Sequence, residues 1–68
     1  MRVLLVEDEV ELAELVAANL RRSGFAVDHV GLAEEARAAV EFGRYEIVLL
    51  DLRLPDGDGF NLIRWLRM

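Results

Sequence analysis

The stretch YEIVLLDLRLPDGDGF, residues 45–60, contains the signals that decide the fold. Its hydrophobic run ends at a single acid, Asp51, and a loop containing Pro55 and two glycines follows. A short run without polar alternation is typical of a strand buried on both faces, as in a parallel sheet covered by helices. Asp51 is therefore either a functional carboxylate at the end of a buried strand or simply the first residue that meets water.

The rest of the chain alternates between strand and helix patterns. Residues 2–6, 25–30 and 46–51 have the pattern of strands, and a helical pattern follows each of them. Asp8 and Glu11 resemble a capping box for the first helix, and Gly24 is a plausible end for it. The second helix is predicted at residues 32–42, and the third begins at Asp58 with an apolar side formed by Phe60, Ile63, Leu66 or Leu62. The order βαβαβα predicts an α/β fold with right-handed crossovers and a parallel sheet.

Length and composition limit what this chain can do alone. It has 68 residues and no cysteine, so we expect one small domain without disulfides or thiolate metal sites. A chain of this size buries only about 60% of the surface that its unfolded form exposes. Hydrophobic residues make up 54% of it, which is rich for so small an interior. We infer that part of this apolar surface is meant for a neighbour.

The charge pattern disfavours nucleic acid and membrane as partners. The formal net charge is −5, and the eight basic residues, all arginine, are scattered along the chain. No basic stripe is available for a phosphate backbone, so direct nucleic-acid binding by this segment is not expected. The apolar runs are too short for a membrane helix, and the N-terminal run is too short for a signal peptide. The sequence therefore predicts a cytoplasmic protein.

Three acids fall at the carboxyl ends of predicted strands. Glu7 and Asp8 follow the first strand, and Asp51 ends the third, so all three are expected at one edge of the sheet, where ligands of such folds bind. Crowded carboxylates call for a cation, and Mg²⁺ suits one or two carboxylates together with water and phosphate oxygens. Asp51 is the better candidate nucleophile, because Asp8 is also needed at the helix start. In the alternative interpretation, these acids are only helix caps and exposed strand ends.

The motifs LLVEDE and IVLLDLRLPDGDG, with a proline four residues and a glycine eight residues after Asp51, resemble the receiver domain of bacterial two-component response regulators. The form of the second motif is most similar to the branch in which the receiver precedes a winged-helix DNA-binding domain. The resemblance implies a flavodoxin-like fold and a phosphoryl group passed from a sensor histidine kinase to Asp51. It also implies Mg²⁺ bound by Asp8, Asp51 and the backbone carbonyl of Arg53, with Glu7 acting through water.

The chain departs from this family in its extent. A receiver has five βα units in the strand order 2-1-3-4-5, whereas residues 1–68 supply three, so we expect a truncated receiver domain with sheet order 2-1-3. The family also uses a serine or threonine and a lysine from the fourth and fifth units to hold the phosphoryl group. The chain has no lysine or threonine, and its only serine is Ser23. We therefore expect weak Mg²⁺ binding, little lasting phosphorylation and no enzymatic turnover.

Other interpretations remain open. A self-associating structural module would form a homo-oligomer through the third strand, residues 48–50, and the third helix, because an uncovered apolar edge recruits other strands. The sequence DGDG at residues 56–59 resembles parts of haloacid-dehalogenase phosphatases, but there the motif follows the strand directly. It also resembles an EF-hand loop, which would require different residues at Phe60, Asn61 and Arg67. A small phosphatase is the third alternative.

Overall fold

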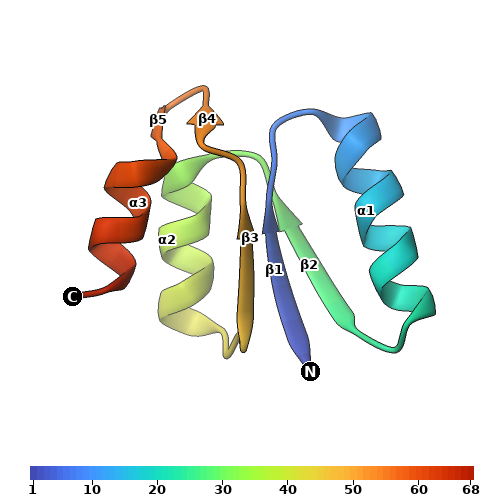
Figure 1. Ribbon diagram of the computed structural model, residues 1–68. Helices are drawn as coiled ribbons and strands as arrows, with labels where there is room; N and C mark the ends of the chain where they lie inside the picture. The colour runs from blue at the N-terminus through green and yellow to red at the C-terminus, as the bar shows by residue number, and fades with distance from the viewer.

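The computed structural model describes residues 1–68 as a three-stranded parallel sheet between helices (Figure 1). The sheet order is β2-β1-β3, which confirms the predicted α/β class and topology. A second, two-stranded sheet joins β4 to β5. The elements are β1 Arg2–Val6, α1 Val10–Arg22, β2 Ala26–Val30, α2 Ala33–Phe42, β3 Ile47–Leu50, β4 Arg53–Leu54, β5 Gly57–Asp58 and α3 Gly59–Leu66.

The central strand β1 determines where the core lies. Its neighbours pair with it in parallel, and Val6 is level with both Val30 of β2 and Leu50 of β3. Successive side chains of a strand point to opposite faces, so a strand covered on both sides must be apolar at every position. Residues 3–6 of β1 are all buried, as this requires.

Each face of the sheet has its own hydrophobic cluster. On one face α1 covers the sheet, and on the other face α2 and α3 do so (Figure 1). The cluster under α1 contains Val3, Leu5, Ala13, Ala17 and Val27. The cluster under α2 and α3 contains Leu4, Val6, Ala33, Ala36, Leu54 and Leu62. In α3 the core residue is thus Leu62, whereas Phe60, which the sequence placed on the apolar side, is 61% exposed.

The predicted capping box at the start of α1 is wrong. The helix begins at Val10, and Glu9 occupies the N-cap position without a side-chain cap. Glu11 is then the second helical residue rather than the third, so Asp8 and Glu11 are out of register for a capping box. The predicted end of the helix is confirmed, because Gly24 has the positive φ of 95° that favours glycine after a helix. Asp8 is therefore free of any capping role.

The segment predicted as a loop at residues 52–57 contains a short hairpin instead. Arg53 of β4 pairs with Asp58 of β5. Leu54 is 92% buried and anchors β4 in the cluster under α2 and α3, which explains why this polar, glycine-containing segment has a defined path. Asp58 is the N-cap of α3, as predicted, and accepts a hydrogen bond of 2.7 Å from the Asn61 backbone N–H.

Side chains of β1, of β2 and of the segment before β3 meet near the end of the sheet where the strands begin. The Asp28 carboxylate accepts a 2.6 Å hydrogen bond from the Tyr45 hydroxyl and forms a 2.7 Å ion pair with Arg2. The Arg2 guanidinium also lies 5.1 Å from the centre of the Tyr45 ring. The hydrogen bond from Tyr45 and then the Arg2 charge hold the pKa of Asp28 below its usual value, and the Asp28 carboxylate raises the pKa of Tyr45.

We expect Tyr45→Phe to lower the free energy of unfolding by about 0.5 to 1 kcal/mol at neutral pH, toward the low end because Asp28 is half exposed. The lowered pKa of Asp28 means that its contribution is present above the unfolded value of about 4 and is lost as the pH falls through the folded value. The raised pKa of Tyr45 means that its contribution is lost as the pH rises above about 10. Denaturant titrations of both proteins between these limits and beyond them test this, and a difference that is independent of pH would contradict it.

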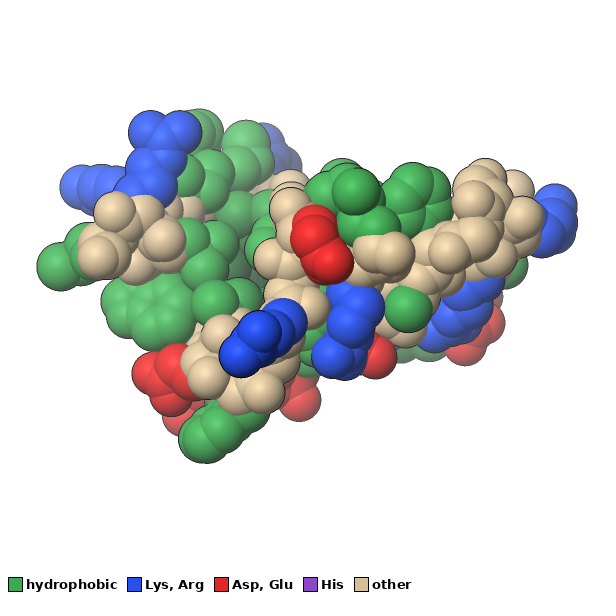
Figure 2. All heavy atoms as spheres, turned by 90° about the horizontal axis from the view of Figure 1, so that it is seen from below, with side chains coloured by type: hydrophobic (Ala, Val, Ile, Leu, Met, Phe, Trp, Pro, Cys, Tyr) green, Lys and Arg blue, Asp and Glu red, His purple; other side chains and the backbone are tan.

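The strand β3 has one partner, β1, so its other edge is open. Ile47 and Leu49 are each 37% exposed, on the face that carries Val3 and Leu5. A hollow of about 350 Å³ lies at the start of β3, between Val40, Tyr45 and Val48. Figure 2, which views the molecule from the end where the strands begin, shows hydrophobic side chains exposed around such a hollow.

None of the helices has the length and apolar character needed to span a membrane.

Candidate functional site

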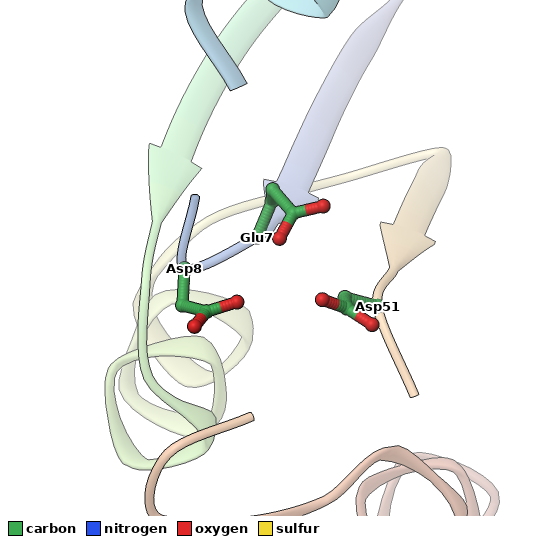
Figure 3. A group of neighbouring side chains, drawn as sticks. All are labelled: Glu7, Asp8 and Asp51. Carbon is green, nitrogen blue, oxygen red and sulfur yellow. The ribbon is translucent and has the colours of Figure 1, made fainter. Parts of the chain in front are cut away.

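The carboxylates of Glu7, Asp8 and Asp51 converge at the carboxyl end of the sheet (Figure 3). Each contributes one oxygen to a group in which the oxygens lie within 4.8 Å of one another. Glu7 and Asp51 are half buried, and Asp8 is exposed. The structure thus brings together the three acids that the sequence placed at this edge.

Main-chain pairing explains why these acids meet. The Asp51 N–H donates to the Val6 carbonyl at 2.9 Å, and the Glu7 N–H donates to the Val30 carbonyl at 3.0 Å. Both bonds extend the parallel pairing by one residue beyond the last apolar pair, so the first polar residues after β1 and β3 emerge side by side. Parallel strands place their carboxyl ends at the same edge, which makes this position a consequence of the topology.

Asp51 is held in its charged form. Its Oδ1 accepts a hydrogen bond of 3.0 Å from the Arg53 backbone N–H. This bond, followed by the interaction with the Glu7 carboxyl, lowers the pKa of Asp51 below its usual value. A carboxylate must be ionised to act as a nucleophile or as a metal ligand, so the environment of Asp51 suits either role.

Glu7 has the opposite tendency. Its Oε2 accepts a hydrogen bond of 3.2 Å from the Glu9 backbone N–H, which lowers its pKa, but burial and the neighbouring Asp51 and Asp8 carboxyls outweigh this. The pKa of Glu7 is therefore raised. Like charges at this separation favour a proton or a cation between them. A hard divalent ion with oxygen ligands fits this donor set, since Mg²⁺ is commonly held by one or two carboxylates and completes its shell with water.

The glycine eight residues after Asp51 is Gly59, and close packing explains why this position requires glycine. A Cβ atom at this position would lie 2.7 Å from the Leu52 Cα and 2.9 Å from the Asp51 carbonyl oxygen, closer than such atoms approach. The Gly59 N–H also donates to the Leu52 carbonyl at 3.0 Å. The start of α3 is thereby packed directly against the segment that carries Asp51, and only glycine leaves room for this contact.

Two polar residues near the site have contacts that the sequence did not reveal. His29, in the edge strand β2, is exposed and places Nε2 2.7 Å from the Glu7 carbonyl oxygen. Asp56, which we considered only as part of the DGDG motif, binds the backbone at the start of α2. These contacts join residues 22 or 23 positions apart, and no local pattern in the sequence signals them.

Comparisons with known proteins agree with this geometry. The response regulator receiver domain family matches residues 3–68. Among curated proteins, the probable transcriptional regulatory protein y4xI of Sinorhizobium fredii is 49% identical over 67 residues, covering 98% of this chain and 29% of that protein. The chain therefore spans less than a third of this relative.

Solved structures give the same result. A CheY-like response regulator receiver domain from Methylobacillus flagellatus superposes with a TM-score of 0.95 at 36% identity, covering 98% of this chain and 57% of that one. The response regulator TrrA from Thermotoga maritima, solved with Mg²⁺-BeF, has a TM-score of 0.93 at 32% identity, covering 97% and 57%. TrrA has also been solved in complex with the histidine kinase ThkA. The chain belongs to the response regulator receiver domain family and has its flavodoxin-like, CheY-like fold.

Proposed function

We propose that the chain is the phosphoacceptor part of a two-component receiver and that Asp51 accepts the phosphoryl group. The observation that supports this most strongly is the convergence of three carboxylates from the ends of β1 and β3, with Asp51 kept charged by the Arg53 N–H. The relatives that carry the family name, and the Mg²⁺-BeF bound to TrrA, support the same role.

The proposed reaction is a transfer from a phosphohistidine of a sensor kinase. A carboxylate oxygen of Asp51 attacks phosphorus, the new P–O bond forms as the P–N bond breaks, and the imidazole nitrogen keeps the electron pair and takes up a proton. Bound Mg²⁺ would neutralise the charge on the phosphoryl oxygens. We propose Asp8, Asp51 and the Arg53 carbonyl as its direct ligands, with Glu7 acting through water.

We further propose that residues 1–68 are the first three βα units of this receiver and that the parent protein is a DNA-binding transcriptional regulator. The coverage of 57% of TrrA supports the first statement, and the name of the Sinorhizobium relative supports the second. Because the chain has no lysine or threonine to hold the phosphoryl oxygens, we expect weak Mg²⁺ binding and poor retention of a phosphoryl group. The single serine, Ser23, follows α1 as its C-cap and lies outside the acidic group.

A Mg²⁺ titration followed by Trp65 fluorescence tests the proposed site. Trp65 is half buried in α3, with the Arg37 guanidinium 5.9 Å from its ring centre, so a shift of α3 changes its surroundings. We expect a saturable change in the wild type and none in Asp51→Asn. Asp58→Asn is a matched control, because it removes the same charge nearby while asparagine still caps α3. No Mg²⁺-dependent change in the wild type, or an equal change in Asp51→Asn, would contradict the proposal.

A second candidate function is self-association without phosphotransfer. The open edge of β3, with Ile47 and Leu49 partly exposed, favours it. In this case a homo-oligomer would form through β3 and α3, and the acids would have no ligand. The two functions are distinguished by Mg²⁺ binding, because self-association by itself is compatible with both.

A further inference from the structure

The first turn of α2 is capped by a residue from a different βα unit. Leu32 occupies the N-cap position and has no side-chain oxygen to offer. The backbone N–H groups of Ala33 and Glu34 donate instead to the two carboxylate oxygens of Asp56, at 2.7 Å and 3.0 Å. The bond from Glu34 and then the bond from Ala33 lower the pKa of Asp56, so this contact is between a charged carboxylate and the positive end of a helix.

The start of α2 is itself located beside the acidic site. Gly31, which leads into α2, lies beside the segment that follows β1, since a Cβ atom on it would be in van der Waals contact, 3.7 Å from the Glu7 carbonyl oxygen and 3.8 Å from the Asp8 Cα. The preceding residue, Val30, accepts the hydrogen bond of the Glu7 N–H. The segment that presents Glu7 and Asp8 therefore sets the position of the first turn of α2.

The β4–β5 hairpin connects Asp56 to Asp51. Asp56 lies in the turn between β4 and β5, and Arg53, in β4, donates its N–H to Asp51 Oδ1. Leu54, the second residue of β4, packs in the same cluster as Ala33. A continuous series of contacts thus runs from Glu7 and Asp8 through the start of α2 and Asp56 to the main chain that binds Asp51.

We propose that Asp56 is a positioning residue for the acidic site, which holds the β4–β5 hairpin against α2 and thereby fixes the Arg53 main chain beside Asp51. Asp56 is not a ligand in this proposal, and it acts only through Arg53. The metal-binding consequence rests on the function proposed above, whereas the effect on the Arg53 main chain does not.

If Asp56 only capped α2, its replacement would affect the Arg53 N–H no more than the loss of another hydrogen bond at the start of this helix. Glu35 also binds the start of α2, because its Oε1 accepts a hydrogen bond of 3.2 Å from the Gly31 N–H. It has no contact with the hairpin among the hydrogen bonds of this structure. Glu35→Ala therefore removes a bond from the same helix start without releasing β4 and β5, and it is the matched control for Asp56→Ala. Asp56→Asn retains an acceptor oxygen and is the conservative variant.

The experiment compares the wild type with Asp56→Ala, Asp56→Asn and Glu35→Ala, at a temperature where circular dichroism shows each protein to be folded. Amide hydrogen exchange by NMR, without metal, reports on the Arg53 N–H. We expect faster exchange in Asp56→Ala, exchange near that of the wild type in Glu35→Ala, and partial rescue in Asp56→Asn. Unchanged Arg53 exchange in Asp56→Ala, or equal acceleration in Glu35→Ala, would overturn the proposal.

A Mg²⁺ titration of the same four proteins tests whether Asp56 affects metal binding at the acidic site. Residues that orient metal ligands change affinity by about tenfold or more when they are replaced, so we expect about a tenfold weaker affinity in Asp56→Ala and no change in Glu35→Ala. If the wild type binds no Mg²⁺, the proposed function fails, and the exchange of the Arg53 N–H alone decides the role of Asp56. If Mg²⁺ binds equally to the wild type and Asp56→Ala, the positioning role is wrong and the proposed function stands.

Discussion

Replacing Leu62 with alanine is expected to lower the free energy of unfolding by about 2 to 5 kcal/mol. The Leu62 side chain has no exposed surface and packs in the cluster that joins α2 and α3 to the sheet. Removing it costs the transfer free energy of its buried methyl groups and leaves a cavity that this small core fills only in part. Domains of this length have a total stability of about 3 to 10 kcal/mol, so we expect a large fraction of Leu62→Ala molecules to be unfolded at 25 °C.

Phe60→Ala is the control for Leu62→Ala. It removes a larger side chain from the same helix, but Phe60 is 61% exposed, so we expect a change of no more than about 0.5 kcal/mol. Urea titrations followed by circular dichroism measure both free energies. Equal losses in the two variants would show that α3 packs through the other side of the helix, and the core described above would then be wrong.

The orientation of α3 illustrates where prediction from sequence reaches its limit. The helix has eight residues, and Phe60, Leu62, Ile63 and Leu66 offer apolar side chains around much of its circumference. The sequence therefore allowed more than one buried side. The structure buries the side that contains Leu62, because Leu62 packs there with Leu54 and with Ala33 of the first turn of α2. Packing between segments distant in sequence, which no local pattern encodes, decides this choice.

The sheet itself was predictable for a physical reason. The runs VLLV in β1 and IVLL in β3 lack polar alternation, which is typical of parallel strands covered on both faces. The structure covers β1 in this way, whereas Ile47 and Leu49 of β3 are each 37% exposed on one face. Once the strands are parallel, their carboxyl ends must share an edge, so the meeting of Glu7, Asp8 and Asp51 follows without further information.

The local contacts around the site were less accessible to prediction. The capping box failed because α1 begins one residue later than its pattern required, and a shift of one residue changes every capping position. The hairpin at β4 and β5 was missed because each of its strands has only two residues. The cap that Asp56 provides for α2 depends on the folded arrangement of two separate βα units.

The open edge of β3 predicts that the chain associates with itself. We expect the wild-type chain to sediment at twice its 7.7 kDa mass or more at high micromolar concentration, because β3 has a free row of backbone groups flanked by apolar side chains. Burying a leucine fully contributes about 1.5 to 3 kcal/mol, and Leu49 has 37% of its surface still to bury. A second copy that added its own β3 would satisfy the open edges of both chains and place its apolar side chains beside Ile47 and Leu49.

Leu49→Lys is therefore expected to shift the mass toward that of the monomer, because a charged side chain beside the edge must be desolvated when another strand is added. Leu15→Lys is the matched control, since it makes the same change at a leucine of α1, outside β3, that is 61% exposed. Light scattering and sedimentation on the three proteins distinguish the outcomes. A stable wild-type monomer would contradict self-association, and an equal response in Leu15→Lys would assign it to general surface hydrophobicity rather than to β3. The phosphoacceptor role proposed for Asp51 is independent of either result, because the acidic group is assembled at the ends of β1 and β3 within one chain.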